Sequence, residues 1–290
     1  MTNKKQTLVR LGLFLFITFS LTWIPHFICL HIWGFEKWMN SPFSLIITLT
    51  MFSPMLGNII TRLITKESWK GSRLHFHFKG NIRFYIIALL IPLIFGAISA
   101  AVVNFSYGNW KFEMAAKKSF ADSFSEFMEQ AVFPLLYGSI FCFGEEFGWR
   151  GYMNDKLKAL TGRTGAVIIG GIFWGLWHAP LVANGYNFGS GHPVLSVALM
   201  CVSCISMNAI LMLLTEKTDS VYPAVLLHTA LDLSAMTLVA VNMISGLSDE
   251  IMTKITELQS SIFLMVIPEA AVGVVFFVLL LRNKTKITPA

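Results

Sequence analysis

The sequence predicts an all-α, polytopic membrane protein with about eight transmembrane helices. Three observations support this: a composition unlike that of soluble proteins, eight apolar stretches of near-spanning length, and an uneven distribution of Lys and Arg between alternate loops. Of the 290 residues, 55% are hydrophobic and 13% are charged, and the mean hydropathy is +0.65. A soluble domain carries roughly 25% charged residues, so the bilayer is the expected solvent for most of this chain.

Eight stretches meet or approach the roughly 20 apolar residues that a helix needs to cross the hydrocarbon core. The first follows a basic start and has no small-x-small cleavage site, so we expect it to remain as a span. The fourth and fifth contain Gly, Glu, Arg and His, which lower hydropathy and often mark function. The expected spans cover residues 11–33, 43–64, 83–105, 128–148, 165–183, 194–215, 221–245 and 260–282.

The distribution of basic residues predicts the orientation. With the N-terminus inside, the eight-span arrangement places 17 of the 22 Lys and Arg residues on the cytoplasmic side. This positive-inside pattern predicts a multi-pass protein of the cell membrane with both termini cytoplasmic. The short start "MTNKKQ" lacks an organellar signal and favours a bacterial source. No repeat or linker divides the chain, so residues 1–290 are expected to form a single membrane domain.

The net charge of +6 raises the question of nucleic acid as a partner. The basic residues lie in short clusters between apolar runs, and the loop "TKESWKGSRLHFHFKG" mixes them with Trp and Phe. Such a loop suits lipid headgroups, so membrane lipids are the expected partners and nucleic acid is not. The four Cys residues all fall in apolar segments and are interpreted as packing residues. The sequence carries no indication of the oligomeric state.

Ionisable residues inside the expected spans are the best guide to function. Each costs roughly 2.5–3.5 kcal/mol at the centre of a membrane helix, so it is retained for a reason. The first six of the costly residues fall in the fourth, fifth and seventh spans, or directly beside them. The set comprises Glu145, Glu146, Arg150, His178, His228, Asp232 and Glu269.

Helical spacing separates the roles of the two adjacent carboxylates. Glu146 and Arg150 are four residues apart and share a helix face, so they are expected to pair. Glu145 is rotated by about 100° from Glu146 and is free for another task. His228 and Asp232 also share a face. These polar faces can be buried only against one another or against a wet cavity.

His178 lies in the segment "FWGLWHAPL", four residues after Trp174. Gly171 and Gly175 nearby would let another helix approach closely. A helix that began at Gly165 would carry His178 about 20 Å from its start, which is too deep to meet Glu145 near the inner side. The fifth span must therefore start in the cytosol, tilt or contain a break, and "TGRTG" permits a start in the cytosol.

One carboxylate and two histidines from separate helices suit hydrolysis. A glutamate can act as a general base on water, and a histidine can donate a hydrogen bond to the developing oxyanion. The same three residue types could instead bind Zn²⁺ and leave an open position for water. No H-E-x-x-H motif occurs, and the sequence leaves both alternatives open.

The three motifs resemble those of the CPBP family of intramembrane proteases, which includes the CAAX prenyl endopeptidases and bacteriocin-processing or self-immunity proteins. The family pattern is E-E-x-x-x-R, then F-x-x-x-H, then H-x-x-x-N or H-x-x-x-D. The sequence matches it over roughly residues 128–245, the expected catalytic core. The matching segments are Glu145-Glu146-x-x-x-Arg150, Trp174-x-x-x-His178 and His228-x-x-x-Asp232.

The resemblance implies that Glu145 activates water, that His178 positions it, and that His228 and Asp232 form or support the oxyanion site. Glu146 and Arg150 are implied to be a structural pair. If a metal is used, the resemblance makes Glu145, His178 and His228 the possible Zn²⁺ ligands.

Two positions depart from the commonest pattern. Trp174 replaces the usual Phe and should preserve an aromatic wall. Asp232 replaces the Asn of the eukaryotic CAAX proteases. An ionised Asp cannot donate a hydrogen bond, so Asp232 is expected either to be protonated or to orient His228 by accepting its other N–H.

We therefore expect an intramembrane endopeptidase that cleaves a membrane-associated peptide or small membrane protein. One alternative is a non-catalytic bacteriocin-immunity or scaffolding protein. Another is a proton-coupled transporter that uses Glu145, His178 and Asp232 as a relay. No inverted repeat supports the transporter.

Overall fold

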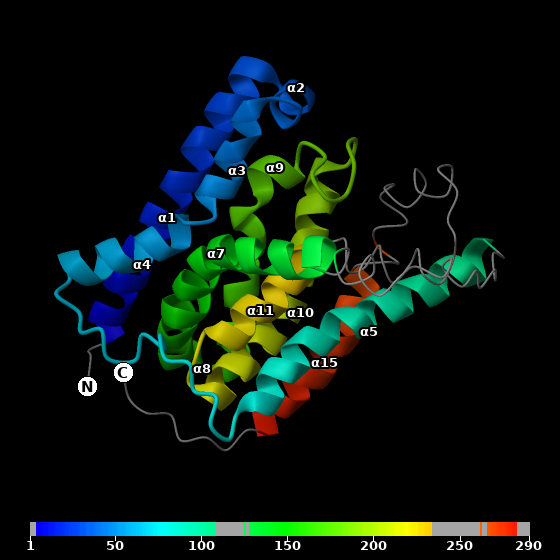
Figure 1. The fold of residues 1–290 in the computed structure, drawn as a ribbon. Helices are drawn as coiled ribbons and strands as arrows, with labels where there is room; N and C mark the ends of the chain where they lie inside the picture. Colours follow the sequence, from blue (N-terminus) through cyan, green and yellow to red (C-terminus); the bar gives the residue numbers. More distant parts are fainter. Residues whose placement is uncertain (1–3, 108–124, 126–127, 234–261, 263–265, 283–290) are drawn as a thin grey trace.

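The computed structural model of the chain describes residues 4–107, 125, 128–233, 262 and 266–282. Every regular element in these residues is helical, so the predicted all-α class is confirmed (Figure 1). The α-helices are α1 (Lys4–Trp33), α2 (Phe35–Met39), α3 (Leu45–Thr50), α4 (Ser53–Ile64), α5 (Ile82–Tyr107), α7 (Phe133–Gly148), α8 (Asn154–Trp177), α9 (Ala179–Val182), α10 (Pro193–Thr218), α11 (Tyr222–Asp232) and α15 (Ile267–Arg282). Short 3₁₀ or π turns cover Pro42–Ser44, Met128–Val132 and Trp149–Met153.

Three helical runs in the described residues are long and apolar enough to cross a membrane: α1, the run Phe133–Trp177, and α10. The pair α3 and α4, bent by 45° at its break, makes a fourth if it counts as one span. These helices agree with a multi-pass membrane protein, but the predicted count of eight spans is not confirmed. Much of the seventh expected span lies outside the described residues.

The fourth and fifth expected spans are not separated by a loop. Helix α7 continues through the π turn Trp149–Met153 directly into α8. The charged residues of this stretch become helical because they find partners: Lys156 bonds to Glu67, and the Lys158 Nζ lies 2.8 Å from a carboxylate oxygen of Glu216. The run is broken once, at Gly162, where φ is 75° and ψ is −177°.

Helix α10 forms the centre of the bundle and packs against α8 and α15. The predicted close approach at the two glycines of α8 is present. A Cβ atom on Gly175 would lie 2.6 Å from the Cα atom of Cys201, and one on Gly171 would collide with the backbone of Ile205. Only a residue without a side chain allows α8 and α10 to come this close.

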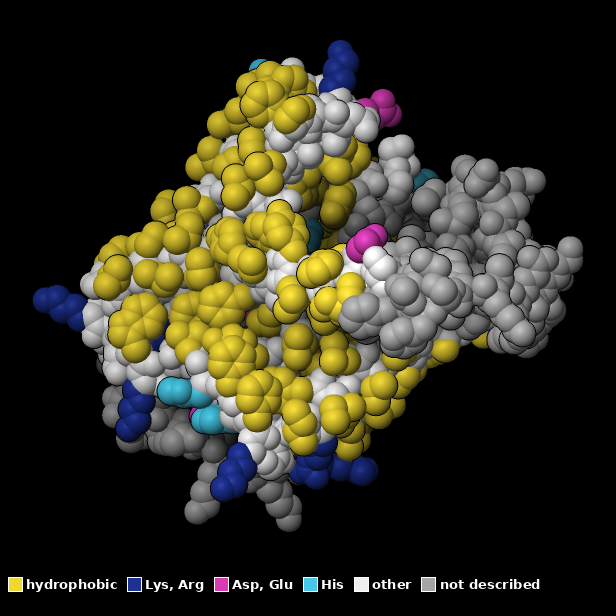
Figure 2. Space-filling model, in the orientation of Figure 1, with side chains coloured by type: hydrophobic (Ala, Val, Ile, Leu, Met, Phe, Trp, Pro, Cys, Tyr) yellow, Lys and Arg dark blue, Asp and Glu magenta, His cyan; other side chains and the backbone are white. Residues whose placement is uncertain are grey.

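The remaining helices complete the walls around α7. Helix α4 packs between α1 and α7, while α11 packs against α5, α7 and α10 (Figure 1). Hydrophobic side chains cover most of the described part of the face in Figure 2, and Lys and Arg lie at its edges. This distribution is expected where lipid tails meet the protein and headgroups meet its rim.

Candidate active site

Helices α7 and α11 and the end of α8 contribute the ionisable side chains of the candidate active site. Glu145 and Glu146 lie in the last turn of α7 and are 2% and 0% exposed. His228 on α11 is 7% exposed, and His178 follows α8 directly. Burying such groups is costly unless they are paired, so their partners restrict what each can do.

Glu146 forms the predicted pair with Arg150. Its Oε1 atom accepts a hydrogen bond from Arg150 Nη1 at 2.8 Å. The same oxygen also accepts from His228 Nδ1 at 2.8 Å, a contact that the sequence interpretation did not foresee. Glu146 therefore does more than pair with Arg150, because it also connects α7 to the histidine of α11.

Glu145 points away from that pair, as its rotation on the helix predicted. Its Oε2 atom accepts a hydrogen bond from the indole Nε1 of Trp174 at 2.9 Å. Among the described residues, no hydrogen bond reaches Oε1. The Arg150 guanidinium carbon lies 4.0 Å from the centre of the Trp174 ring, on which it stacks.

His178 is held by its own helix. Its Nδ1 atom lies 2.8 Å from the carbonyl oxygen of Trp174, and because a carbonyl only accepts, Nδ1 donates. The Nε2 atom of the neutral ring then carries a lone pair. The break at Gly162, inside "TGRTG", is the kind of irregularity that the depth of His178 required.

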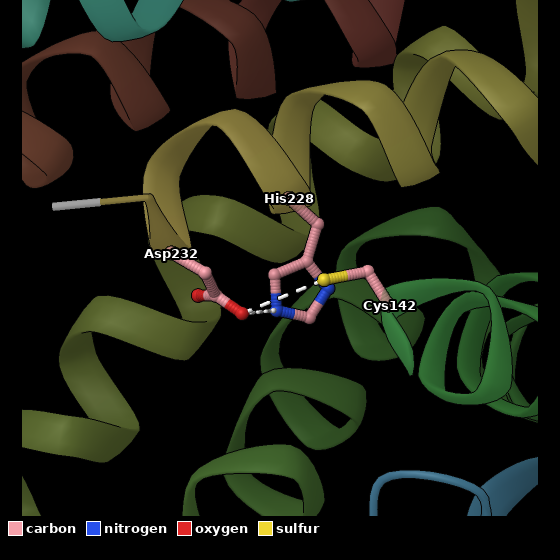
Figure 3. Close-up of side chains that lie close together, drawn as sticks. All are labelled: Cys142, His228 and Asp232. Carbon is pink, nitrogen blue, oxygen red and sulfur yellow. Dashed lines mark hydrogen bonds and ion pairs between the residues drawn. The ribbon is translucent and has the colours of Figure 1, made fainter. Parts of the chain in front are cut away.

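His228 lies between two carboxylates. While Nδ1 faces Glu146, Nε2 lies 3.5 Å from the Oδ2 atom of Asp232 (Figure 3). The Asp232 side chain is 50% exposed, so this side of the pair is open. The same Oδ2 atom lies 3.5 Å from the sulfur of Cys142 on α7. The two ring nitrogens of His228 thus each face a carboxylate.

Trp174 is the common neighbour of the candidate residues. Its ring centroid lies 5.2 Å from that of His228 and 6.0 Å from that of His178, in addition to the bond with Glu145. The structure thus gathers the three predicted side chains around one indole. In the described part of the chain, no direct hydrogen bond joins His178 to Glu145 or to His228.

The residues best placed to hold a metal ion differ from the predicted set. Among the described residues, Cys142, His228 and Asp232 bring one ligand atom each within 4.8 Å of one another. Sulfur, imidazole nitrogen and carboxylate oxygen are all ligands of Zn²⁺. The bond from His228 Nδ1 to Glu146 is also the support that metal-bound histidines commonly receive. This donor set therefore fits a zinc ion.

Cys142 is the residue that sequence reasoning missed, because it was assigned to packing. Cys142 and Glu146 are four residues apart and so share a face of α7, a signal available in the sequence. Glu269, the remaining ionisable residue of the set, accepts a hydrogen bond from the Ser203 hydroxyl.

Comparison with known proteins supports the resemblance. Residues 127–234 match the family model described as type II CAAX prenyl endopeptidase Rce1-like. Over 105 residues the chain is 33% identical to a protein named CAAX prenyl protease 2 from Methanococcus maripaludis, a match that spans 36% of this chain and 36% of that protein. The family match contains all three motifs. Over this segment, which is little more than a third of the chain, the protein is similar to the type II CAAX prenyl endopeptidases.

Proposed function

We propose that this protein is an intramembrane endopeptidase that hydrolyses a peptide bond of a membrane-associated substrate. The observation that supports this most directly is the buried Glu145 carboxylate, which is bonded through one oxygen to Trp174, the residue whose ring also lies beside those of His178 and His228. The similarity to a protein named CAAX prenyl protease 2 supports the same class of reaction.

The first step is activation of water. Glu145 Oε1 takes a proton from a water molecule, and the lone pair of His178 Nε2 accepts the second hydrogen bond of that water. Together they aim the oxygen at the substrate carbonyl carbon. General-base catalysis of this kind contributes roughly 10²- to 10⁴-fold to a rate.

The second step forms and collapses the tetrahedral intermediate. As the new C–O bond forms, the carbonyl electron pair moves to oxygen. His228 donates to that oxygen from Nε2, since a ring nitrogen that faces a carboxylate carries a proton, and both of its nitrogens do. The C–N bond then breaks, and the leaving nitrogen takes the proton held by Glu145.

Zinc remains an alternative source of electrophilic assistance. Held by Cys142, His228 and Asp232, it would supply a Lewis acid near the substrate carbonyl. Glu145 lies outside this donor set, and its task as proton acceptor is the same with or without the ion.

The substrate and location follow from chemistry and charge. The basic loops favour a candidate site toward the cytoplasmic face of a cell membrane, with both termini inside. If the source is bacterial, a leader or precursor peptide delivered by the membrane is a better candidate than a prenylated protein.

The test is comparative peptidomics of membranes that contain wild-type protein or the Glu145→Ala variant. The wild type should release peptide fragments that the variant does not, with a loss of about 100-fold or more. His178→Ala and His228→Ala should behave likewise. Glu269→Gln is the matched control, because it alters a carboxylate that bonds to Ser203 outside the three motifs.

Two results would contradict the proposal. If Glu145→Ala protein is present in the membrane at wild-type level and still processes its peptides fully, the proposed enzymatic function is wrong. A cellular phenotype that survives all three alanine substitutions would instead favour the immunity or scaffolding function.

A further inference from the structure

Trp174 stands where the family pattern usually has Phe, and it brings an atom that Phe lacks. The indole Nε1–H donates to Glu145 Oε2 at 2.9 Å. A phenyl ring can form the same aromatic wall but has no hydrogen-bond donor. Trp174 therefore does more than form an aromatic wall, because it also holds the proposed catalytic carboxylate by a hydrogen bond.

Burial makes this hydrogen bond consequential. Trp174 is 5% exposed and Glu145 is 2% exposed, so water cannot readily replace the indole as a donor. Hydrogen bonds to ionised groups are roughly twice as strong as neutral ones, and an unpaired buried carboxylate is costly. The indole therefore restricts the orientation of the Glu145 carboxylate.

Trp174 is itself fixed from several sides. The Arg150 guanidinium stacks on its ring, with 4.0 Å between the guanidinium carbon and the ring centre. The His228 ring meets it edge-on at 5.2 Å. The backbone carbonyl of the same residue accepts from His178 Nδ1. One residue thus contacts the base, both histidines and the neighbouring ion pair.

We propose that Trp174 is a positioning residue that fixes the catalytic carboxylate of this protein through its indole N–H. By holding Oε2, it turns Oε1 of Glu145 toward the water that is to be activated. This inference rests on the proposed function, and it makes the protein dependent on a donor that relatives with Phe at this position do not possess.

The decisive variant is Trp174→Phe, which keeps an aromatic ring and removes the donor. Its kcat should fall by roughly 10- to 100-fold, the effect of losing one hydrogen bond to a charged group. KM should stay within about twofold, because the N–H faces the carboxylate and not the substrate. The assay uses protein in nanodiscs and a quenched-fluorescent peptide that spans a cleavage site found by peptidomics.

Trp149→Phe is the matched control. Trp149 is 1% exposed, and its Nε1 atom has no hydrogen-bond partner among the described residues. The substitution removes a buried indole N–H close to the site without removing a hydrogen bond, so kcat should change by less than about twofold.

A spectroscopic measurement tests the contact without any turnover. In protein with ¹⁵N-labelled Trp side chains, the indole resonance lost in Trp174→Phe belongs to Trp174. Glu145→Ala removes the acceptor and should move this resonance upfield. The Trp38 resonance, whose N–H donates to the Phe43 carbonyl at 2.9 Å, should stay in place.

The outcomes separate the two proposals. Wild-type kcat in Trp174→Phe, equal losses in both Trp→Phe variants, or an indole resonance unmoved by Glu145→Ala would each overturn the positioning role. Failure of the wild type to cleave any peptide would overturn the proposed function and this role with it, even if the resonance shift showed that the hydrogen bond exists.

Discussion

At the scale of single residues, one oxygen of Glu146 makes both the ion pair with Arg150 and the contact with His228 that joins α7 to α11. Both side chains are almost completely buried. Within the described structure, Glu146 Oε2 and the Arg150 Nε and Nη2 atoms have no hydrogen-bond partner. The charges therefore depend on one another, and removal of either would leave an uncompensated charge in the interior.

We predict that Glu146→Gln lowers the free energy of unfolding by about 3 kcal/mol, because breaking a buried pair strands its partner. The double variant Glu146→Gln/Arg150→Met should recover most of that stability, since no cation remains unpaired. It should not recover hydrolysis, because His228 still lacks its carboxylate acceptor. Thermal unfolding in detergent and the peptide assay measure the two effects; recovery of both would limit Glu146 to a structural role.

The sequence predicted residue contacts within a helix better than contacts between helices. The pair Glu146 and Arg150 follows from four-residue spacing alone. The bonds from Trp174 to Glu145 and from His228 to Glu146 join residues 29 and 82 positions apart. They depend on how each helix is rotated about its axis, which spacing does not specify.

At the scale of elements, the break in α8 lies at a residue with an unusual backbone. Gly162 has φ 75° and ψ −177°, a conformation essentially restricted to glycine. A Cβ atom there would meet nothing within 4 Å. A larger residue at position 162 would therefore strain the backbone without a steric clash. Relief of that strain would change the direction of the following part of α8, which carries Trp174 and leads to His178.

We predict that Gly162→Ala destabilises the protein by about 1–3 kcal/mol and reduces hydrolysis, since the part of α8 beyond the break would be reoriented. Gly12→Ala is the control: it lies in α1, its Cβ would also meet nothing within 4 Å, and its φ is not positive. In a helix this change should be neutral or stabilising by roughly 0.5–1 kcal/mol. Equal unfolding midpoints for both variants would contradict the role of the break.

Element boundaries were predicted less well than element type. The motif "TGRTG" was interpreted as a possible start of the fifth span, whereas in the structure it holds the break at Gly162 inside α8. The helical stretch between residues 149 and 164 was expected to be a loop, because its charges lower hydropathy. Lys156 in this stretch pairs with Glu67, which lies 89 residues earlier in the chain. A local hydropathy window does not include a partner at that distance.

At the scale of the whole molecule, Glu67 ties the loop after α4 to the rest of the bundle. Lys156 and the Tyr152 hydroxyl donate hydrogen bonds to it, and Arg10 Nε lies 3.4 Å away. Burial alone would raise the pKa of Glu67, but the Lys156 hydrogen bond and charge and the Tyr152 hydroxyl outweigh it and hold the pKa below its usual 4.5.

This lowered pKa predicts acid-sensitive stability. The folded chain holds the Glu67 carboxylate ionised to lower pH than the unfolded chain does, so its contribution is complete above the ordinary pKa and is lost as pH falls through the lowered one. The unfolding midpoint of the wild type should therefore drop more between pH 6 and pH 3.5 than that of Glu67→Gln. Parallel pH profiles would show that Glu67 contributes nothing.

The polar contacts of α1 have a consequence for biosynthesis. Thr22 receives a hydrogen bond from Trp177 Nε1 at 2.7 Å and also bonds to Ser53, while His26 bonds to Thr50. Trp177 is made 155 residues after Thr22, which at cellular elongation rates is roughly 10 to 30 s later. During that interval Thr22 lacks its Trp177 donor, although Ser53 and Thr50, the other partners of α1, are made much earlier. The hydrogen bond between α1 and Trp177 can therefore form only after the end of α8 has been synthesised.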